Sequence, residues 1–361
     1  MKKITILSNT TYGIDMFLLN TLRTLQETYE VNIITNAESN HYSNFDIKLY
    51  SLPLTRKPSF FKDFINQLKI IRILNTINPD LLITLTPKSG LLGSIAGKFC
   101  RIKTIHFFTG QVWKNSKGIK RLILKFFDTL IIKLNFRNYC DSFTQRDFLK
   151  EQIFLKDIPL YIIGNGSLGG VDINKFNIEN KINSKIDNLN LLYLARKTKE
   201  KGAIDVLSIF KKLYSIDKNF RLYFIGPEEE ILDEEIKTLK NIDNFINVNE
   251  HVEILEYLEL TDILLMPSRR EGFGSIVIQA AAMGIPSVGY DIYGLQDSIS
   301  IQNGIRTPPN NINAFVNGIL KIKSNLKENE KLVRENCRNH ALRYDENFFI
   351  SAFIKEISNI I

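Results

Sequence analysis

The residues best suited to chemistry lie in one short segment, where a glycine-rich turn separates a predicted strand from a predicted helix. The turn reads Pro-Ser-Arg-Arg-Glu-Gly-Phe-Gly-Ser over 267–275, and a helical pattern continues to Met283. Gly272 and Gly274 can take positive φ and let the main chain approach a ligand closely. We expect Ser275 to cap the helix, whose open N–H groups would favour an anion such as a phosphate.

A second candidate group follows the strand predicted over 189–194. Arg196 and Lys201 come directly after it, and Gly202 follows the lysine. Two fixed cations beside a helix N-terminus suit a departing diphosphate, which gains negative charge as its bond breaks. Taken alone, basic side chains in a Lys-rich loop also fit a solvated surface.

The elements that must position these residues alternate between strand and helix along the whole chain. Strands are expected at 3–8, 31–35, 80–86, 103–107, 161–163, 189–194, 221–225, 263–266 and 285–289. Such alternation predicts parallel sheets covered on both faces, with ligands beyond the carboxyl ends of the strands. The polar sequence around 177–190 is typical of a linker between two α/β domains.

Length and charge set broad limits. The 361 residues predict two domains, and 47 Lys and Arg against 39 Asp and Glu give a net charge of +8. That excess favours phosphate-rich partners or an anionic membrane surface, although an ordinary basic protein fits equally well. Cys100, Cys140 and Cys337 are far apart, which argues against disulfides or structural zinc and fits a reducing cytoplasm. The basic residues accompany no base-reading module, so nucleic-acid binding is poorly supported.

No segment predicts insertion into a membrane. The apolar run after Met1-Lys2-Lys3 is too short for a signal peptide. Nowhere does an uninterrupted apolar run approach the roughly 20 residues of a spanning helix. We therefore expect a protein that is not integral to a membrane.

The segment 267–284 resembles the signature of bacterial retaining glycosyltransferases of the GT-B fold, family four. In that family two glutamates are separated by seven residues; Glu271 matches the first, which contacts the donor sugar. The second, which binds the donor ribose, falls on Gln279. A Gln amide can still bridge a diol, without the charge assistance of a carboxylate. A solvent-facing role for Gln279 is the alternative.

The resemblance extends over nearly the whole chain. Arg196, Lys201 and Gly202 are similar to the family's Arg-x4-Lys-Gly pair, which holds the donor pyrophosphate. The fold implied is GT-B, two Rossmann-like domains that face each other across a cleft. The implied boundaries are 1–175 for acceptor binding, 186–343 for nucleotide-sugar binding, and 344–361 for a helix packing back towards the N-terminal domain. The expected donor-binding residues are Gly272, Phe273, Gly274, Ser275, Gln279 and Asn165.

Three N-terminal segments look like those of transferases encoded with capsule, O-antigen or exopolysaccharide pathways. They cover 86–90, 106–113 and 165–172, each at or after a predicted strand end. His106 is the best candidate there for touching the donor sugar or the acceptor hydroxyl, although a structural histidine is the alternative. Lys88 could neutralise an acceptor phosphate, and Thr109 is a further candidate on the acceptor side. The loop containing Asn165 is either a hinge-side loop under the nucleotide or only a tight turn.

Basic and apolar residues interleave from Lys114 to Arg137, a pattern that suits a helix lying on an anionic leaflet. A core-facing amphipathic helix with a solvated basic edge fits as well. Arg56 and Lys57, followed by Phe60-Phe61, form a second basic and aromatic segment that could meet lipid or acceptor phosphates.

The resemblance implies transfer of a hexosyl or N-acetylhexosaminyl unit from a nucleotide sugar, UDP-linked, to a polyprenyl-diphosphate-linked glycan, with retention of configuration. It places the enzyme peripherally at the cytoplasmic face of the inner membrane. Neither a metal nor another cofactor is expected, and no Asp-x-Asp pair lies at a strand end. The alternatives are a non-catalytic nucleotide-sugar-binding partner protein and a GT-B epimerase. A phosphorylase would need a pyridoxal lysine, for which there is no motif.

Overall fold

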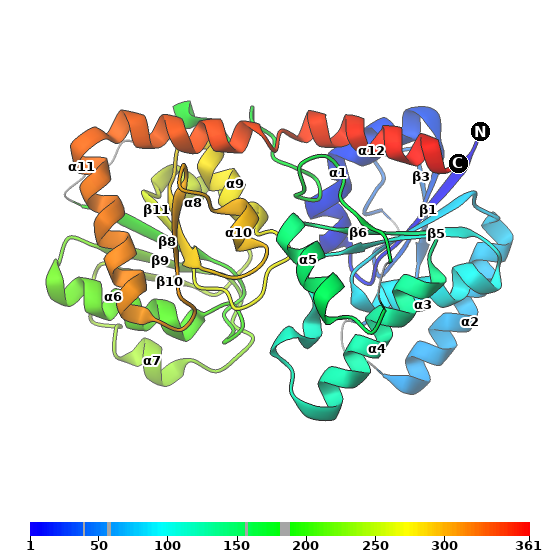
Figure 1. Ribbon diagram of the computed structural model, residues 1–361, viewed down its shortest axis with the longest axis horizontal. Helices are drawn as coiled ribbons and strands as arrows, with labels where there is room; N and C mark the ends of the chain where they lie inside the picture. The colour runs from blue at the N-terminus through cyan, green and yellow to red at the C-terminus, as the bar shows by residue number, and fades with distance from the viewer. Residues whose placement is uncertain (39, 56–58, 156–157, 181–187) are drawn as a thin grey trace. The chain divides into compact units, whose positions relative to one another are not determined.

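The computed structural model describes residues 1–361 except 39, 56–58, 156–157 and 181–187 (Figure 1). The chain forms two compact units, Met1–Gly170 with Glu346–Ile361, and Val171–Asp345. Val171 belongs to the second unit, because its N–H donates to the Tyr344 carbonyl at 2.8 Å and its side chain lies in that unit's core.

The first unit is a parallel sheet with the strand order β3-β2-β1-β4-β5-β6-β7. Its strands are β1 Lys3–Leu7, β2 Glu30–Thr35, β3 Ile47–Ser51, β4 Leu81–Leu85, β5 Lys103–Phe108, β6 Arg137–Cys140 and β7 Leu160–Tyr161. The order turns back between β1 and β4, which pair directly. The loops after β1 and β4 lead to helices on opposite faces of the sheet, and in this fold ligands bind at the carboxyl edge where such loops diverge.

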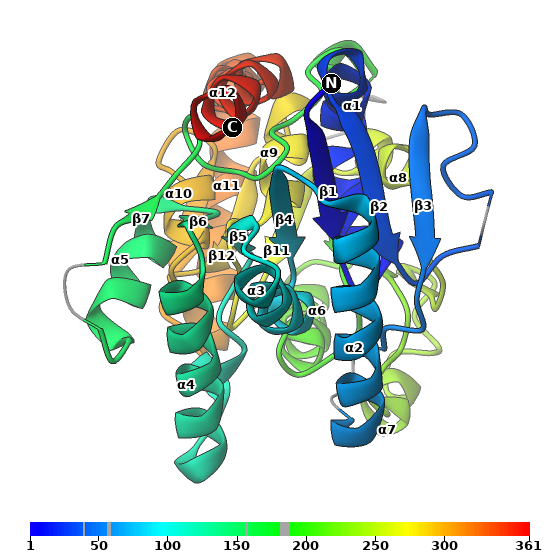
Figure 2. The same cartoon turned by 90° about the vertical axis from the view of Figure 1, so that its right-hand side faces the viewer.

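Helices cover both faces of this sheet. They are α1 Thr11–Thr28, α2 Phe60–Ile77, α3 Pro87–Phe99, α4 Gly118–Leu134, α5 Phe143–Gln152 and α12 Glu346–Ile360. One apolar cluster joins α1 and α12 to the sheet, and another joins α2 and α3 to its other face. Alternate strand residues supply the two clusters: Ile6 belongs to the first and Leu7 to the second. Figure 2 shows α2, α3 and α4 side by side.

The C-terminal helix α12 is tied to the first unit by apolar and polar contacts. Phe353 stacks on Phe107 with the ring centroids 5.8 Å apart. Glu356 accepts hydrogen bonds from Arg137 and Tyr139, each at 2.5 Å. These contacts fix α12 against β5 and β6.

The second unit repeats the same topology, with the strand order β10-β9-β8-β11-β12-β13, all parallel. Its strands are β8 Asn190–Leu194, β9 Arg221–Ile225, β10 Phe245–Val248, β11 Ile263–Met266, β12 Ser287–Tyr290 and β13 Gly304–Thr307. Its helices are α6 Ala203–Ile216, α7 Asp233–Lys237, α8 Ile254–Leu260, α9 Ser275–Ala282, α10 Leu295–Ser298 and α11 Ile312–Leu342. Both units are thus Rossmann-like, as the sequence predicts.

Hydropathy and length together leave no helix, among the residues described, that could cross a membrane.

Candidate functional site

Two loops of the second unit meet at the point where its strand order turns back. β8 and β11 pair directly, so the loop after β8 and the loop after β11 leave the carboxyl edge side by side. The first loop carries Arg196 and Lys201, and the second carries Glu271. Topology therefore brings together residues that are far apart in the sequence.

Lys201 and Glu271 form an ion pair across these loops. The Lys201 Nζ donates to Glu271 Oε1 at 2.6 Å, and the side chains are 20% and 12% exposed. This contact joins the cation expected at the donor pyrophosphate to the carboxylate expected at the donor sugar. Both groups remain partly open to solvent, which a ligand-binding pair requires.

Glycines allow the loop backbones to pack this closely. Gly202 has φ +76°, and a Cβ there would lie 2.2 Å from the Pro267 carbonyl oxygen. Gly294 has φ +84°, and its Cβ would lie 2.8 Å from the carbonyl oxygens of both Glu271 and Gly272. A side chain at either position would push the Glu271 turn away from its neighbours.

Arg196 pairs with Glu229, a residue to which the motif spacing does not point. Its guanidinium donates to Glu229 Oε2 at 2.5 Å, with the side chains 27% and 42% exposed. The Tyr193 hydroxyl donates to the Arg196 carbonyl at 3.0 Å, which fixes the start of the loop. Arg196 and Lys201 both lie on the loop after β8, and each is held by a carboxylate.

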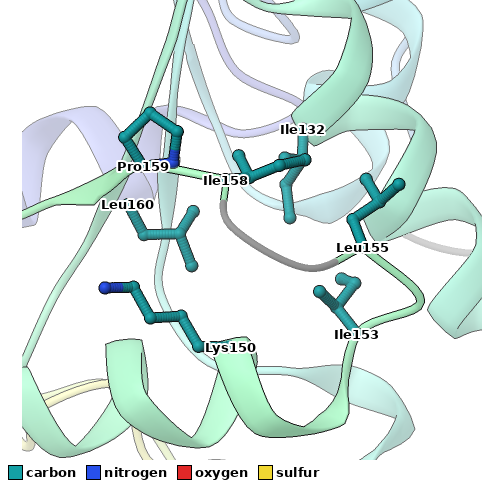
Figure 3. Close-up of a pocket in the computed structure, with 7 residues that line it drawn as sticks. All are labelled: Ile132, Lys150, Ile153, Leu155, Ile158, Pro159 and Leu160. Atoms are coloured by element: carbon teal, nitrogen blue, oxygen red, sulfur yellow. The ribbon is translucent and has the colours of Figure 1, made fainter.

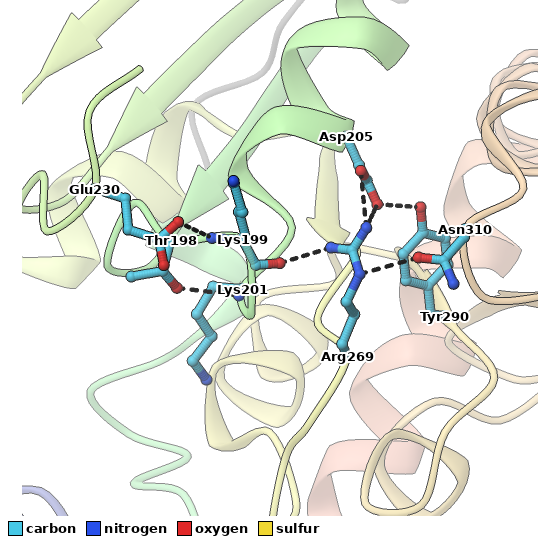
Figure 4. Close-up of polar contacts among 8 residues, drawn as sticks. All are labelled: Thr198, Lys199, Lys201, Asp205, Glu230, Arg269, Tyr290 and Asn310. Atoms are coloured by element: carbon cyan, nitrogen blue, oxygen red, sulfur yellow. Dashed lines mark hydrogen bonds and ion pairs between the residues drawn. The ribbon is translucent and has the colours of Figure 1, made fainter. Parts of the chain in front are cut away.

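The rest of the loop after β8 is anchored by Arg269 (Figure 4). Its guanidinium binds both Asp205 carboxylate oxygens, at 3.0 and 2.8 Å, and donates to the Lys199 carbonyl at 2.6 Å. The Tyr290 hydroxyl donates to the same carboxylate at 2.6 Å, and Asn310 accepts from Arg269 at 2.9 Å. This network holds the loop in place. In the sequence, only the charged residues of the glycine-rich turn point to it.

A further ion pair, half-buried, lies next to these residues. Arg270 donates to Glu200 Oε1 at 2.5 Å. Burial acts to raise the pKa of Glu200, but the hydrogen bond and charge of Arg270, with the charges of Lys201 and Arg196, outweigh it and lower the pKa. Glu200 therefore stays ionised within a group of cations.

Lys197 is buried, so the basic residues of the loop after β8 do not form a fully solvated surface. Its Nζ donates to Asn247 Oδ1 at 2.6 Å, to the Val248 carbonyl at 2.7 Å and to Asn249 Oδ1 at 2.5 Å. Burial lowers the pKa of Lys197 to about 8. The lysine thereby links the loop after β8 to the end of β10.

The helix after the glycine-rich turn begins one residue earlier than expected. Gly274, with φ +91°, occupies the N-cap position of α9, and Ser275 is the first helical residue rather than the cap. The expectation for Ser275 as a cap is therefore wrong, because the turn needs a left-handed residue before the helix. The side chain of Phe273 is fully buried in the unit's core, so it can meet a donor only through its main chain.

Gln279 lies one turn into α9 and is half-buried. Its Oε1 atom is buried and has no hydrogen-bond partner among the residues that the structure describes. A fully solvent-facing role is therefore excluded for this atom. Since a buried polar atom without a partner costs free energy, an incoming hydroxyl group would satisfy it.

The first unit places His106 in its interior. The residue is 1% exposed on β5, its Nδ1 lies 2.8 Å from Thr84 Oγ1, and a Cβ on Gly90 would lie 2.4 Å from the imidazole Cε1 atom. Burial lowers the pKa of His106 to about 3. The structural alternative fits this neutral, covered ring better than contact with a sugar or an acceptor.

The other N-terminal candidates are more dispersed. Lys88 forms an ion pair with Asp63 at 2.5 Å, and only 13% of its side chain is exposed, so an acceptor phosphate would have to compete with that carboxylate. Thr109 is half-buried directly after β5, and Asn165 is exposed. Arg56 and Lys57 lie outside the described residues.

The Asn165 loop is a tight turn within the first unit. Ser167 donates its N–H to the Asp141 carbonyl at 2.8 Å, and Leu168 donates to Asp141 Oδ1 at 2.6 Å. At Gly169 a Cβ would lie 2.5 Å from the Phe17 carbonyl oxygen. The turn is therefore held against β6 and α1.

Thr86, in the segment 86–90 singled out above, meets Asn9 at the turning point of the first sheet, and neither residue has an individual role in the sequence motifs. Thr86 has φ +69° and ψ +146°, a strained conformation for a β-branched residue, and its Oγ1 donates to Asn9 Oδ1 at 2.6 Å. The usable signal was the position of Thr86 at the end of a predicted strand, directly before Pro87. Strain of this kind is concentrated at functional sites, so this edge of the first unit is also a candidate surface.

A pocket of the first unit lies apart from the candidate site. Figure 3 shows a pocket lined by Ile132, Lys150, Ile153, Leu155, Ile158, Pro159 and Leu160. It lies where β7 begins, away from the carboxyl strand ends that bind ligands in this fold. Within the described residues, no group of three or more His, Cys, Asp or Glu side chains is arranged to hold a metal ion.

Comparisons with known proteins agree with this geometry. The model of the glycosyl transferases group 1 family matches residues 174–339, and that of the glycosyl transferase 4-like family matches residues 3–141. The chain belongs to the family-four glycosyltransferases of the GT-B fold. The resemblance inferred from the sequence motifs is thus confirmed.

Several individual glycosyltransferases match over most of their length. The capsular polysaccharide biosynthesis glycosyltransferase CapM of Staphylococcus aureus is 25% identical over 342 residues, covering 90% of this chain and 87% of CapM. The UDP-Gal:alpha-D-GlcNAc-diphosphoundecaprenol alpha-1,3-galactosyltransferase of Escherichia coli is 22% identical over 340 residues, covering 87% and 84%. HepE of Anabaena, solved with UDP and glucose, has a TM-score of 0.79 at 14% identity, covering 99% and 100%.

Proposed function

We propose that this glycosyltransferase moves a hexosyl or N-acetylhexosaminyl unit from a UDP-linked donor to a polyprenyl-diphosphate-linked glycan in bacterial surface polysaccharide biosynthesis. The observation that carries the proposal is the Lys201–Glu271 ion pair beside Arg196 at the turning point of the second sheet. The names of two relatives support it, since one acts with UDP-Gal on a diphosphoundecaprenol-linked sugar and HepE was solved with UDP.

In the proposed reaction the second unit binds the nucleotide sugar and the first unit binds the acceptor. The bond from the anomeric carbon to the β-phosphate oxygen breaks while the acceptor oxygen bonds to the same face of that carbon, so configuration is retained. The acceptor proton passes to the departing diphosphate. Arg196 and Lys201 stabilise the negative charge that the diphosphate gains, and no metal is required.

The remaining contacts orient the donor. Glu271 accepts hydrogen bonds from the sugar hydroxyls, and Gln279 presents an unpartnered oxygen to the ribose. The N–H groups at the start of α9 add a favourable dipole for the diphosphate. The donor contacts are thus concentrated in the second unit.

A peripheral position at the cytoplasmic face of the membrane completes the proposal. The first half of α4 exposes Ile119, Leu122, Ile123 and Phe126, and α2 begins with exposed Phe60 and Phe61. Basic residues, among them Lys120, lie between the apolar ones of α4. Exposed apolar groups flanked by cations suit an anionic leaflet better than water.

The test is turnover. Purified protein is incubated with UDP-glucose, UDP-galactose or UDP-N-acetylglucosamine and a lipid extract containing polyprenyl-diphosphate sugars, and UDP release and labelled lipid are measured. We expect release with one of these donors, and at least about a hundredfold loss in Arg196→Ala and Glu271→Ala. Wild-type turnover in both variants would contradict the proposal, and so would the absence of transfer with every donor. The anomeric configuration of the product tests retention.

A further inference from the structure

The loop after β9 carries three consecutive glutamates with different surroundings. Glu228 accepts hydrogen bonds from the Leu232 N–H and from the Asn249 side chain, each at 3.2 Å. Glu230 accepts from the Lys199 N–H at 3.0 Å. These two carboxylates hold the backbone, whereas Glu229 is 42% exposed and contacts the side chain of Arg196.

The backbone around this contact is fixed on both sides. Lys197 donates its N–H to the Pro227 carbonyl at 2.8 Å and continues the pairing of β8 with β9 as far as Glu228. At Gly226, with φ +130°, a Cβ would lie 2.1 Å from the Ala195 carbonyl oxygen. The loops after β8 and β9 therefore run in close contact, and Glu229 is held within reach of Arg196.

A carboxylate on Arg196 has a direct consequence for ligand binding. Its oxygens offer the guanidinium the same type of acceptor as a phosphate does. A diphosphate that binds Arg196 must either replace Glu229 or share the guanidinium with a nearby like charge, and both cost free energy. Lys201 differs, because its partner Glu271 belongs to the site itself.

We infer that Glu229 is an internal competitor of the donor diphosphate, which occupies Arg196 in the nucleotide-free protein and releases it when a nucleoside diphosphate binds. The inference rests on the proposed donor site. Glu229 thereby lowers the affinity for the donor and for the nucleoside diphosphate product, which favours release of the product. Because the pair is partly exposed, the competition weakens as salt concentration rises.

The experiment measures the Kd of UDP by calorimetry for the wild type, Glu229→Gln, Arg196→Ala and the double variant. Glu234→Gln is the matched control, since it removes the same charge from an exposed position on nearby α7. Thermal unfolding of each variant checks that it is folded. We expect Glu229→Gln to bind UDP about two- to fivefold more tightly than Glu234→Gln at low salt. The gain should disappear in the Arg196→Ala background.

The outcomes separate this inference from the function on which it rests. Unchanged or weaker UDP binding in Glu229→Gln, with a loss in Arg196→Ala, would overturn the competitor role and leave the donor site intact. A gain that persists without Arg196 would overturn it as well, because the effect would then be one of net charge. If UDP binds neither the wild type nor Glu229→Gln, both proposals are contradicted.

Discussion

At the scale of single residues, burial decides which charged or titratable groups can act. Lys201 and Glu271 keep part of their surface open, whereas His106 is covered by β4 and by the bare backbone of α3 at Gly90. A ring held neutral in the interior contributes to stability rather than to proton transfer at neutral pH. The pH dependence of folding should therefore report on His106.

Lowering the pH should destabilise the first unit through this histidine. The pKa of His106 is about 3 in the fold and about 6.5 when unfolded, so unfolding takes up a proton below pH 6.5. The free energy of unfolding should fall by about 2 kcal/mol at pH 5 and continue to fall towards pH 3. Fluorescence of the single tryptophan, buried Trp113 of the first unit, follows the transition in urea.

The variant His106→Asn should have a flatter dependence of stability on pH between 7 and 5 than the wild type. His251→Asn, at an exposed position of the second unit, is the matched control. Equal slopes for His106→Asn and the wild type would show that the ring is not held neutral.

At the scale of elements, the site depends on loops that approach each other by way of glycine. Gly202 starts α6 in the left-handed conformation and lets the loop after β8 rest against Pro267 at the end of β11. A short loop between two parallel strands and their helices has little freedom to relax. The position of Lys201 is thus linked to the backbone of the residue that follows it.

Gly202→Ala should damage both stability and ligand binding. Its Cβ would lie 2.2 Å from a carbonyl oxygen, a collision added to the strain of positive φ, and we expect a loss of about 3–4 kcal/mol. Gly118→Ala is the matched control, since Gly118 also has positive φ, but no atom of the described part of the chain would lie within 4 Å of an added Cβ. The control should lose about 1–2 kcal/mol. Similar melting temperatures for both variants would contradict the role of close packing.

At the scale of the whole molecule, the first unit exposes apolar groups at one end of its helices. In parallel α/β units the helices run antiparallel to the strands, so α2 and α4 both begin at the carboxyl edge of the sheet. Their first turns carry Phe60, Phe61 and Ile119, all more than 70% exposed. This surface would bring the proposed lipid-linked acceptor to the edge of the sheet that binds ligands.

Vesicle binding tests that surface. Phe61→Ser should weaken cosedimentation with phosphatidylglycerol vesicles about threefold or more, because a buried aromatic ring is worth roughly 1 kcal/mol or more. Phe99→Ser is the matched control, since Phe99 is 71% exposed and Phe61 73%, but Phe99 ends α3 at the opposite edge. Equal losses in the two variants, or binding to neutral vesicles alone, would contradict the proposed membrane face.

The sequence was sufficient to predict the central strands and the loops that carry the site. β8, β9 and β11 are continuous apolar runs that end at polar or glycine-rich loops, so their carboxyl ends were visible. β6 was missed because it reads Arg-Asn-Tyr-Cys, and its Arg137 and Tyr139 are satisfied by Glu356 from the end of the chain. Such a tertiary contact leaves no local pattern.

Within the site, too, local sequence patterns predict some residues, whereas tertiary contacts decide the others. Arg196, Lys201 and Glu271 could be placed on one rim because each follows a recognisable strand. The roles of Glu229 and Glu200 could not be predicted, since a glutamate in an acidic or basic loop has no periodic signal and its partner is set by backbone packing. The burial of His106 likewise depends on Gly90 of a neighbouring helix.

The most direct test of the central claim compares the affinity of UDP with that of uridine by calorimetry, in the wild type and in Arg196→Met and Lys201→Met. If the two cations bind the diphosphate, UDP should bind the wild type at least about a hundredfold more tightly than uridine. Each variant should lose about tenfold or more of that gain, while its affinity for uridine stays the same. Equal affinity of the wild type for UDP and uridine, or an undiminished gain in both variants, would contradict the account.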